Sequence, residues 1–178
     1  MSRGYPPILV CADLQVQYLG EECGADRAAA RLLALLELWR AELWPVLHLK
    51  RIAQAAWFDP ASNLSEWSAA FRPRPGEMVF EHPLPSAYSA SRFAEYMASM
   101  RGVHCLVAGC SLDESILATV IEGFHRGHRF CVVGDAVTCV PSAAGNAEGH
   151  HAAMMRAIGK FAAVEQSSGL IAAAASDA

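Results

Sequence analysis

The sequence predicts a three-layer α/β fold in which a mostly parallel sheet of about six strands lies between two layers of helices. Short apolar runs rich in Val, Ile and Leu alternate with longer segments that have helical hydrophobic period. These runs lack the polar alternation of a strand with one solvent face, so both faces of the sheet should be buried. A chain of 178 residues that is 53% hydrophobic can form one core, and we expect a single domain over residues 1–178.

The apolar runs predict six strands, of which the last is the weakest. Their expected bounds are 8–12, 46–49, 78–80, 105–108, 130–133 and 162–165. Four helices are expected between them, at 26–44, 89–100, 112–126 and 147–158. Gly102, Gly127 and Gly159 follow the last three of these helices, where a left-handed residue is favoured.

The third helix should begin at a capping box. Ser111 is followed three residues later by Glu114, which predicts that Ser111 caps the helix and that Ser115 lies just past its first turn.

Residues 51–75 predict a long, mostly irregular connection that leaves the carboxyl end of the second strand. Ligands of open α/β sheets bind outside the carboxyl ends of the strands, so its aromatic residues either wall a substrate pocket or pack onto the domain itself. These aromatics are Trp57, Phe58 and Trp67. At the other end of the chain, the small residues 172–178 are expected to fray.

Composition excludes several classes of partner. A net charge of −4 and a pI near 5.9 argue against nucleic acid binding. We find no secretory leader, and no apolar run reaches the roughly 18 residues of a membrane span. The six cysteines match no zinc pattern, and a chain with its own core needs no disulfides, so free thiols in the cytoplasm are expected.

Four motifs stand at strand ends or helix starts. They are Asp13-Leu14-Gln15 after the first apolar run, Pro75-Gly76-Glu77 with His82 and Ser86-Ala87-Tyr88, Gly109 to Thr119 around Ser115, and Asp135-Ala136 after the fifth run. In order and spacing they resemble the isochorismatase-like cysteine hydrolases from about residue 8 to residue 169. The resemblance implies a Rossmann-like sheet, a small-molecule substrate or ligand, and a homo-oligomer, commonly a dimer or tetramer.

The resemblance also points to the site. In that family the catalytic triad is Asp, Lys and Cys, and the matching positions here hold Asp13, His82 and Ser115. A helix start lowers the pKa of a thiol enough to give thiolate, but a serine hydroxyl needs a base to take its proton. One interpretation is therefore a Ser-His-Asp triad in which Asp13 orients His82 and His82 activates Ser115 for amide or ester hydrolysis.

A second interpretation needs only the acid. The isochorismatase branch hydrolyses an enol ether, for which Asp13 would protonate carbon and no acyl-enzyme is required. A third is that the site is no longer catalytic and the domain binds a ligand or assembles with partners. A fourth is hydrolysis through other residues, such as Cys110, Lys50 or Tyr18.

No cofactor or metal is expected. The nicotinamidase branch of the family carries a zinc site after the second strand, but His48-Leu49-Lys50-Arg51 in that region offers two cations where ligands would be. We interpret His150 and His151 as capping or interface residues. His125 and His128 flank a helix end and receive no catalytic role.

Overall fold

The computed structural model describes residues 7–19, 27–53, 59–100, 102–139 and 147–177, and its centre is a six-stranded sheet. All strand pairs are parallel, and the order across the sheet is β3-β2-β1-β4-β5-β6. The strands are β1 (Ile8–Ala12), β2 (Val46–Arg51), β3 (Met78–His82), β4 (His104–Gly109), β5 (Arg129–Val137) and β6 (Ala163–Glu165). The predicted α/β architecture is confirmed, and most strands run longer than their apolar runs.

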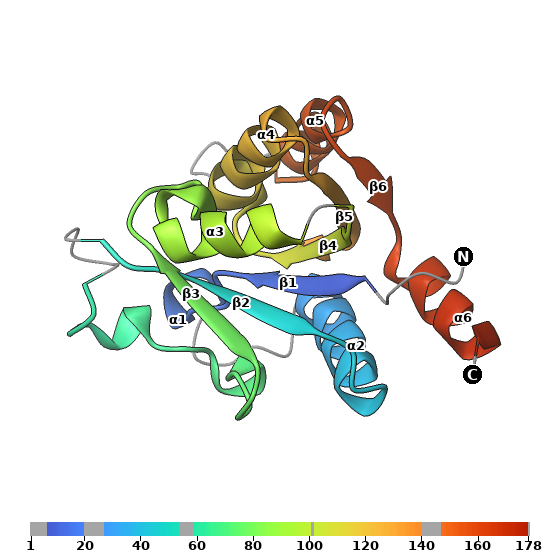
Figure 1. Ribbon diagram of the computed structural model, residues 1–178, viewed down its shortest axis with the longest axis horizontal. Coiled ribbons are helices and arrows are strands. Elements are labelled where there is room, and N and C mark those ends of the chain that lie inside the picture. Colours follow the sequence, from blue (N-terminus) through green and yellow to red (C-terminus); the bar gives the residue numbers. More distant parts are fainter. Residues whose placement is uncertain (1–6, 20–26, 54–58, 101, 140–146, 178) are drawn as a thin grey trace.

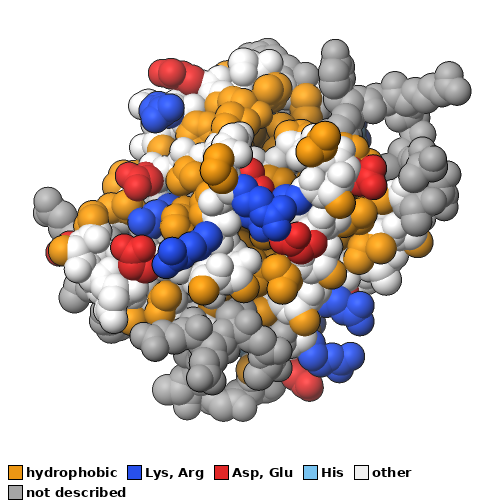
Figure 2. All heavy atoms as spheres, turned by 90° about the horizontal axis from the view of Figure 1, so that it is seen from below, with side chains coloured by type: hydrophobic (Ala, Val, Ile, Leu, Met, Phe, Trp, Pro, Cys, Tyr) orange, Lys and Arg blue, Asp and Glu red, His pale blue; other side chains and the backbone are white. Residues whose placement is uncertain are grey.

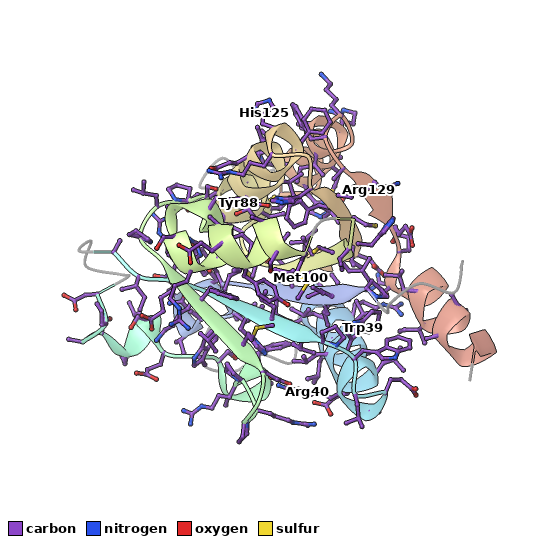
Figure 3. All side chains as sticks on the ribbon, viewed as in Figure 1. Trp39, Arg40, Tyr88, Met100, His125 and Arg129 are labelled. Carbon is purple, nitrogen blue, oxygen red and sulfur yellow. The ribbon has the colours of Figure 1, made fainter. Side chains whose placement is uncertain are left out.

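Helices cover both faces of the sheet (Figure 1). One face packs against α3 (Ser91–Ser99), α4 (Leu117–His125) and α5 (Ala147–Ile158), and the other against α2 (Arg27–Ala41) and α6 (Ser167–Asp177). Successive residues of β1 alternate between the two cores, with Val10 in the first and Leu9 and Cys11 in the second. Figure 3 shows Tyr88 and Trp39 on opposite sides of the sheet. Strand β1, in the middle of the sheet, is apolar and buried throughout because each of its side chains meets a helix layer.

The helix ends differ in part from expectation. The described part of α2 begins at Arg27, and Asp26 lies outside the described residues. This helix ends at Ala41, earlier than predicted, and Leu43 takes a left-handed φ of 55°. Gly102 and Gly127 have the predicted positive φ, of 83° and 77°. The left-handed cap predicted at Gly159 is wrong, since its φ is not positive.

The prediction that the C-terminus frays is also wrong, because Ser167–Asp177 forms α6. Ala favours helix, and the helix is fastened where Asp135 accepts hydrogen bonds from the backbone N and the hydroxyl of Ser167, both at 2.7 Å. Leu170 is buried against the α2 side of the sheet. No local sequence pattern predicts these hydrogen bonds, since Asp135 and Ser167 are distant in sequence.

The described residues of the long connection, 52–53 and 59–75, are irregular apart from two short 3₁₀ turns, Asn63–Ser65 and Ala69–Phe71. Its Trp67 packs edge-on against His48 and under Lys50, so this aromatic packs onto its own domain. Trp57 and Phe58 lie outside the described residues.

The surface seen from below in Figure 2 mixes basic and acidic side chains. Arg40 and Arg74 are both paired with Glu37. Among the described residues, no helix combines the length and the apolar character needed to cross a bilayer.

The strand order fixes where a site belongs. The chain proceeds from β1 outward to β2 and β3, returns to the other side of β1 as β4, and continues to β5 and β6. The crevice outside the carboxyl ends of β1 and β4 is therefore the switch point at which ligands of such sheets bind. Asp13 directly follows β1, and the helical segment that carries Ser115 follows β4.

Candidate active site

Asp13 is held in an uncommon conformation at the end of β1. Its φ is 48°, which an Asp tolerates better than most residues, and it is 0% exposed. The neighbouring strand approaches closely at Gly109, where an added Cβ would lie 2.2 Å from the Ala12 carbonyl oxygen. Only glycine fits there, and the close approach brings the segment after β4 beside Asp13.

Gln15 of the same motif has a structural role. Its side-chain oxygen accepts from the Arg51 backbone N at 2.9 Å, while its amide donates to the carbonyls of Arg51 and Ser65 at 3.0 Å. This buried side chain therefore joins the end of β2 to the loop that follows it.

His82 lies at the end of β3 and contacts Asp13. Its Nε2 is 2.9 Å from Asp13 Oδ1, and both side chains are fully buried. Its Nδ1 is 2.7 Å from the carbonyl oxygen of Leu84. A carbonyl only accepts, so Nδ1 must carry a hydrogen. The Nε2–Oδ1 contact is then either an imidazolium bonded to a carboxylate or a neutral ring accepting from a protonated Asp13.

The surroundings of His82 favour its charged form. Burial opposes the charge and is the largest single influence, but the Asp13 carboxylate and the hydrogen bonds to Asp13 and Leu84 outweigh it and raise the pKa of His82 above its ordinary value. His82 thus places an imidazole whose charged form is favoured beside Asp13, at the position where the resemblance places a Lys.

Ser115 lies in the turn that connects β4 to α4. Residues Leu112–Ile116 form a π-helix, and the Ile116 N–H reaches the Ser111 carbonyl at 3.0 Å. Ser111 precedes this turn as predicted, but the capping box is wrong because the Ser111 side chain makes no capping hydrogen bond. The Leu112 N–H instead bonds the Thr138 carbonyl at 2.7 Å, so a neighbouring strand end supplies the partner that a local cap would have.

The expected contact between His82 and Ser115 is not made. Both ring nitrogens of His82 are bonded elsewhere, and the buried Oγ of Ser115 has no hydrogen-bond partner among the described residues. The structure thus joins Asp13 to His82 but leaves the serine outside this pair.

Several buried polar atoms just beyond the carboxyl ends of β1 and β4 lack partners in the described part of the chain. They are Asp13 Oδ2, Ser111 Oγ, Ser115 Oγ and the Gln17 side-chain amide. Buried polar groups are nearly always bonded, so a set of unbonded ones near two adjacent strand ends indicates a place for water or a ligand.

Two further residues contribute to the electrostatics of this region. Burial, the Asp13 charge and the Glu114 charge raise the pKa of the Tyr18 phenol, while Arg51 opposes the shift. Arg51 is 7% exposed, aligns with His82 across β2 and β3, and also acts to lower the pKa of His82. Sequence reasoning gave Arg51 no role, although its place at the end of a strand beside the His82 strand was a usable signal.

The other candidates from sequence have structural partners. Cys110 Sγ is 3.0 Å from Thr138 Oγ1, and the Lys50 ammonium lies over Trp67. His128 stacks on Tyr88 and is 2.6 Å from its hydroxyl. Thr119 accepts from the Ala87 N–H at 2.9 Å, so the motif threonine fastens the Ser86-Ala87-Tyr88 segment.

A second buried histidine belongs to a separate network. His48 Nε2 is 2.7 Å from Glu77 Oε2, and Glu77 also accepts from the Arg40 side chain and from the Arg74 N–H. Figure 3 labels Arg40 on α2, below the sheet. Burial first of all, and also the Arg40 charge, lower the pKa of His48 although Glu77 opposes the shift. Burial opposes ionisation of Glu77, yet these hydrogen bonds lower its pKa to about 2.

The strand order and the buried acid–histidine pair together define an α/β protein with its candidate active site at the carboxyl edge of a parallel sheet. A comparison with family models matches the Isochorismatase domain over residues 7–168. The chain therefore belongs to the isochorismatase family.

Solved structures agree with this assignment. An isochorismatase from Pseudomonas putida KT2440 superposes with a TM-score of 0.81 at 25% identity, covering 94% of each chain. A cysteine hydrolase from Pseudomonas syringae pv. phaseolicola has a TM-score of 0.79 at 16% identity and covers 99% of each chain. N-carbamoylsarcosine amidase from Thermoplasma acidophilum has a TM-score of 0.68 at 21% identity, covering 90% of this chain and 96% of the other. The sequence matches none of the curated proteins with which it was compared.

Proposed function

We propose that this protein is a small-molecule hydrolase in which Asp13 and His82 act together as one acid–base group. The observation that carries the proposal is the buried 2.9 Å contact between them, with Asp13 Oδ2 left unbonded among the described residues. Because the Leu84 carbonyl requires a hydrogen on Nδ1, one proton is shared between His82 Nε2 and Asp13 Oδ1. Asp13 Oδ2 is then the atom that faces a substrate.

Hydrolysis of an enol ether uses such a pair most directly. Asp13, protonated on Oδ2, transfers that proton to the terminal alkene carbon, and the carboxylate that remains is stabilised at Oδ1 by the His82 imidazolium. Water adds to the resulting oxocarbenium carbon and returns a proton to the pair. The hemiketal then breaks into a ketone and an alcohol, so protons balance and no covalent intermediate on the enzyme is needed.

Ser115 has a different role in this proposal from the one in a serine triad. With no base on its hydroxyl, Ser115 is a weak nucleophile but a good hydrogen-bond donor to a substrate oxygen or to the attacking water. An amide or ester could be attacked by Ser115 only if Asp13 itself took the hydroxyl proton, because both ring nitrogens of His82 are bonded elsewhere.

A non-catalytic binding protein is the second candidate. The observation in its favour is that Ser115 lacks the hydrogen bond to an imidazole that would activate it. On this hypothesis the unbonded atoms of the crevice hold a ligand without changing it.

A hydrolase screen over enol ethers, esters and amides separates these hypotheses. We expect turnover that Asp13→Asn lowers by about 10²- to 10⁴-fold, the usual range for a lost acid–base group. His48→Gln is the matched control, since it removes the other buried histidine, and should change the rate less than threefold. Turnover that survives Asp13→Asn, or no turnover of any compound bound by the wild type, would contradict the proposal.

The Ser115→Ala variant tests the role of the serine. Loss of one hydrogen bond corresponds to roughly a tenfold lower kcat/KM, whereas loss of a nucleophile costs several orders of magnitude. Labelling of Ser115 by a serine-reactive phosphonate that disappears in His82→Ala would restore the triad hypothesis. The homodimer or homotetramer expected from the family stays a prediction, which light scattering on the purified protein can test.

A further inference from the structure

Three potential metal ligands from three different elements meet away from the Asp13–His82 pair. Asp113 lies in the π-helical turn Leu112–Ile116, Cys139 follows β5, and His150 lies in the first turn of α5. Their ligand atoms all lie within 4.8 Å of one another. The two helices beside them, α4 and α5, run side by side in Figure 1 and pack together.

We propose that Asp113, Cys139 and His150 form a binding site for a divalent metal ion, with Zn²⁺ as the best fit. The proposal is independent of the hydrolase chemistry proposed above. It departs from the sequence expectation of no metal, because ligands separated by 26 and 11 residues match no zinc spacing and are united only by the fold.

The distances suit a tetrahedral ion. Zinc bound to N, O and S ligands sets those atoms about 3.3 to 3.6 Å apart, from bond lengths of about 2.0 to 2.3 Å. His150 Nε2 is now 2.9 Å from Asp113 Oδ2, and the other separations do not exceed 4.8 Å. Rotamer adjustments of well under 1 Å per atom would therefore place all three atoms around one ion.

The donor set selects among metals. One imidazole nitrogen, one sulfur and one carboxylate oxygen suit Zn²⁺ or Co²⁺, whereas Mg²⁺ and Ca²⁺ require mostly oxygen ligands. All three residues are half-buried, so water can complete the fourth position. Binding would release the Cys139 thiol proton to solvent, since the thiolate is the ligand.

A metal ion bound at this site would affect the structure around Ser115. Asp113 is two residues before Ser115, and His150 lies in the first turn of the helix packed beside α4. A bound ion would fasten α5 to the turn that positions Ser115. It would thereby stabilise the folded protein in proportion to its affinity.

The test uses tag-free, metal-stripped full-length protein and titrations with ZnCl₂ and CoCl₂. We expect one ion per chain, a thiolate-to-cobalt absorption band in the near ultraviolet, and a higher Tm with Zn²⁺. Cys139→Ser should abolish the band, and Asp113→Asn and His150→Gln should each weaken binding at least tenfold. The neighbouring His151→Gln is the matched control and should bind as the wild type does.

A second readout avoids variants altogether. Zn²⁺ should protect Cys139 of the wild type from alkylation by iodoacetamide, as measured on its peptide by mass spectrometry. Absence of saturable binding at one ion per chain, binding that is equal in His150→Gln and His151→Gln, or unprotected Cys139 in the presence of Zn²⁺ would overturn the proposal. The three side chains would then be neighbours that hold no ion, with Asp113 and His150 joined by the hydrogen bond seen here.

Discussion

Two fully buried histidines each contact a carboxylate, yet their surroundings differ in one respect that separates a candidate site from a structural network. His82 meets Asp13 at 2.9 Å and His48 meets Glu77 at 2.7 Å. Glu77 is saturated, with Arg40, the Arg74 N–H and His48 all bonded to it. Asp13 keeps an oxygen unbonded among the described residues.

The charge on each histidine follows from that difference. Arg40 already neutralises Glu77, so burial and the cation lower the pKa of His48. Asp13 forms a hydrogen bond with His82, which also bonds the backbone carbonyl of Leu84. The Asp13 charge and these two hydrogen bonds raise the pKa of His82. A saturated pair contributes to folding, whereas an unsaturated one retains bonding capacity for a substrate.

The largest expected difference between the two pairs is in activity. Asp13→Asn should lower kcat/KM by about 10²- to 10⁴-fold because it removes the atom that transfers the proton. Glu77→Gln should leave kcat/KM within about threefold of the wild type, since no step of the proposed reaction uses Glu77. Steady-state kinetics on the best substrate of the screen measures kcat/KM for both variants. Equal losses of kcat/KM would contradict the assignment of Asp13 to the active site and of Glu77 to a structural network.

The next effect concerns the positive charge beside Asp13. His82→Lys preserves a cation and should retain activity within about tenfold, whereas His82→Ala should lose about a hundredfold. The same measurement applies to both variants, with circular dichroism to verify folding. If His82→Lys were as inactive as His82→Ala, the imidazole itself rather than its charge would be required.

Substitution of Glu77 should have its main effect on the free energy of unfolding. Glu77→Gln leaves Arg40 without its main partner, and for a mostly buried pair we expect a loss of about 2 kcal/mol in the free energy of unfolding. The Glu77 pKa of about 2 lies below its unfolded value, so its contribution is present above about pH 4.5 and is lost as the pH falls toward 2. Urea unfolding between pH 3 and 7 measures it, and a variant as stable as wild type would contradict the network's role.

The smallest effect is a pair of opposite pH dependences. The folded-state pKa of His82 is raised, so its stabilisation is full below about pH 6.5 and is lost as the pH rises through the folded value. The pKa of His48 is lowered, so His48 costs stability as the pH falls below about 6.5. The wild-type advantage over His82→Gln should therefore shrink with rising pH, and that over His48→Gln should grow. Unfolding titrations at pH 5.5 to 9 would reveal parallel curves if the two environments were alike.

The sequence predicted the features that show in local residue patterns. It missed the features that depend on contacts between residues distant in the sequence. The apolar runs located all six strands and the motifs identified the family, because each run and each motif is a short stretch of consecutive residues. The α6 helix was missed because its anchor, Asp135, lies 32 residues before Ser167. The hydrogen bond from His82 Nδ1 to the Leu84 carbonyl was missed for a different reason. Every residue has a backbone carbonyl, so residue types do not predict which one a side chain will bond. That bond occupies the nitrogen that a serine triad would have needed.

The protonation of the two histidine rings tests the central claim most directly. In protein labelled with ¹⁵N-histidine, NMR reports which ring nitrogens carry hydrogen at each pH, without any substrate. We predict that His82 carries hydrogen on Nδ1 and titrates at a higher pH than His48, whose neutral ring carries its hydrogen on Nε2. A His82 ring that lacks hydrogen on Nδ1, or that loses its charge at a lower pH than His48, would contradict the account of Asp13 and His82 as a shared-proton pair.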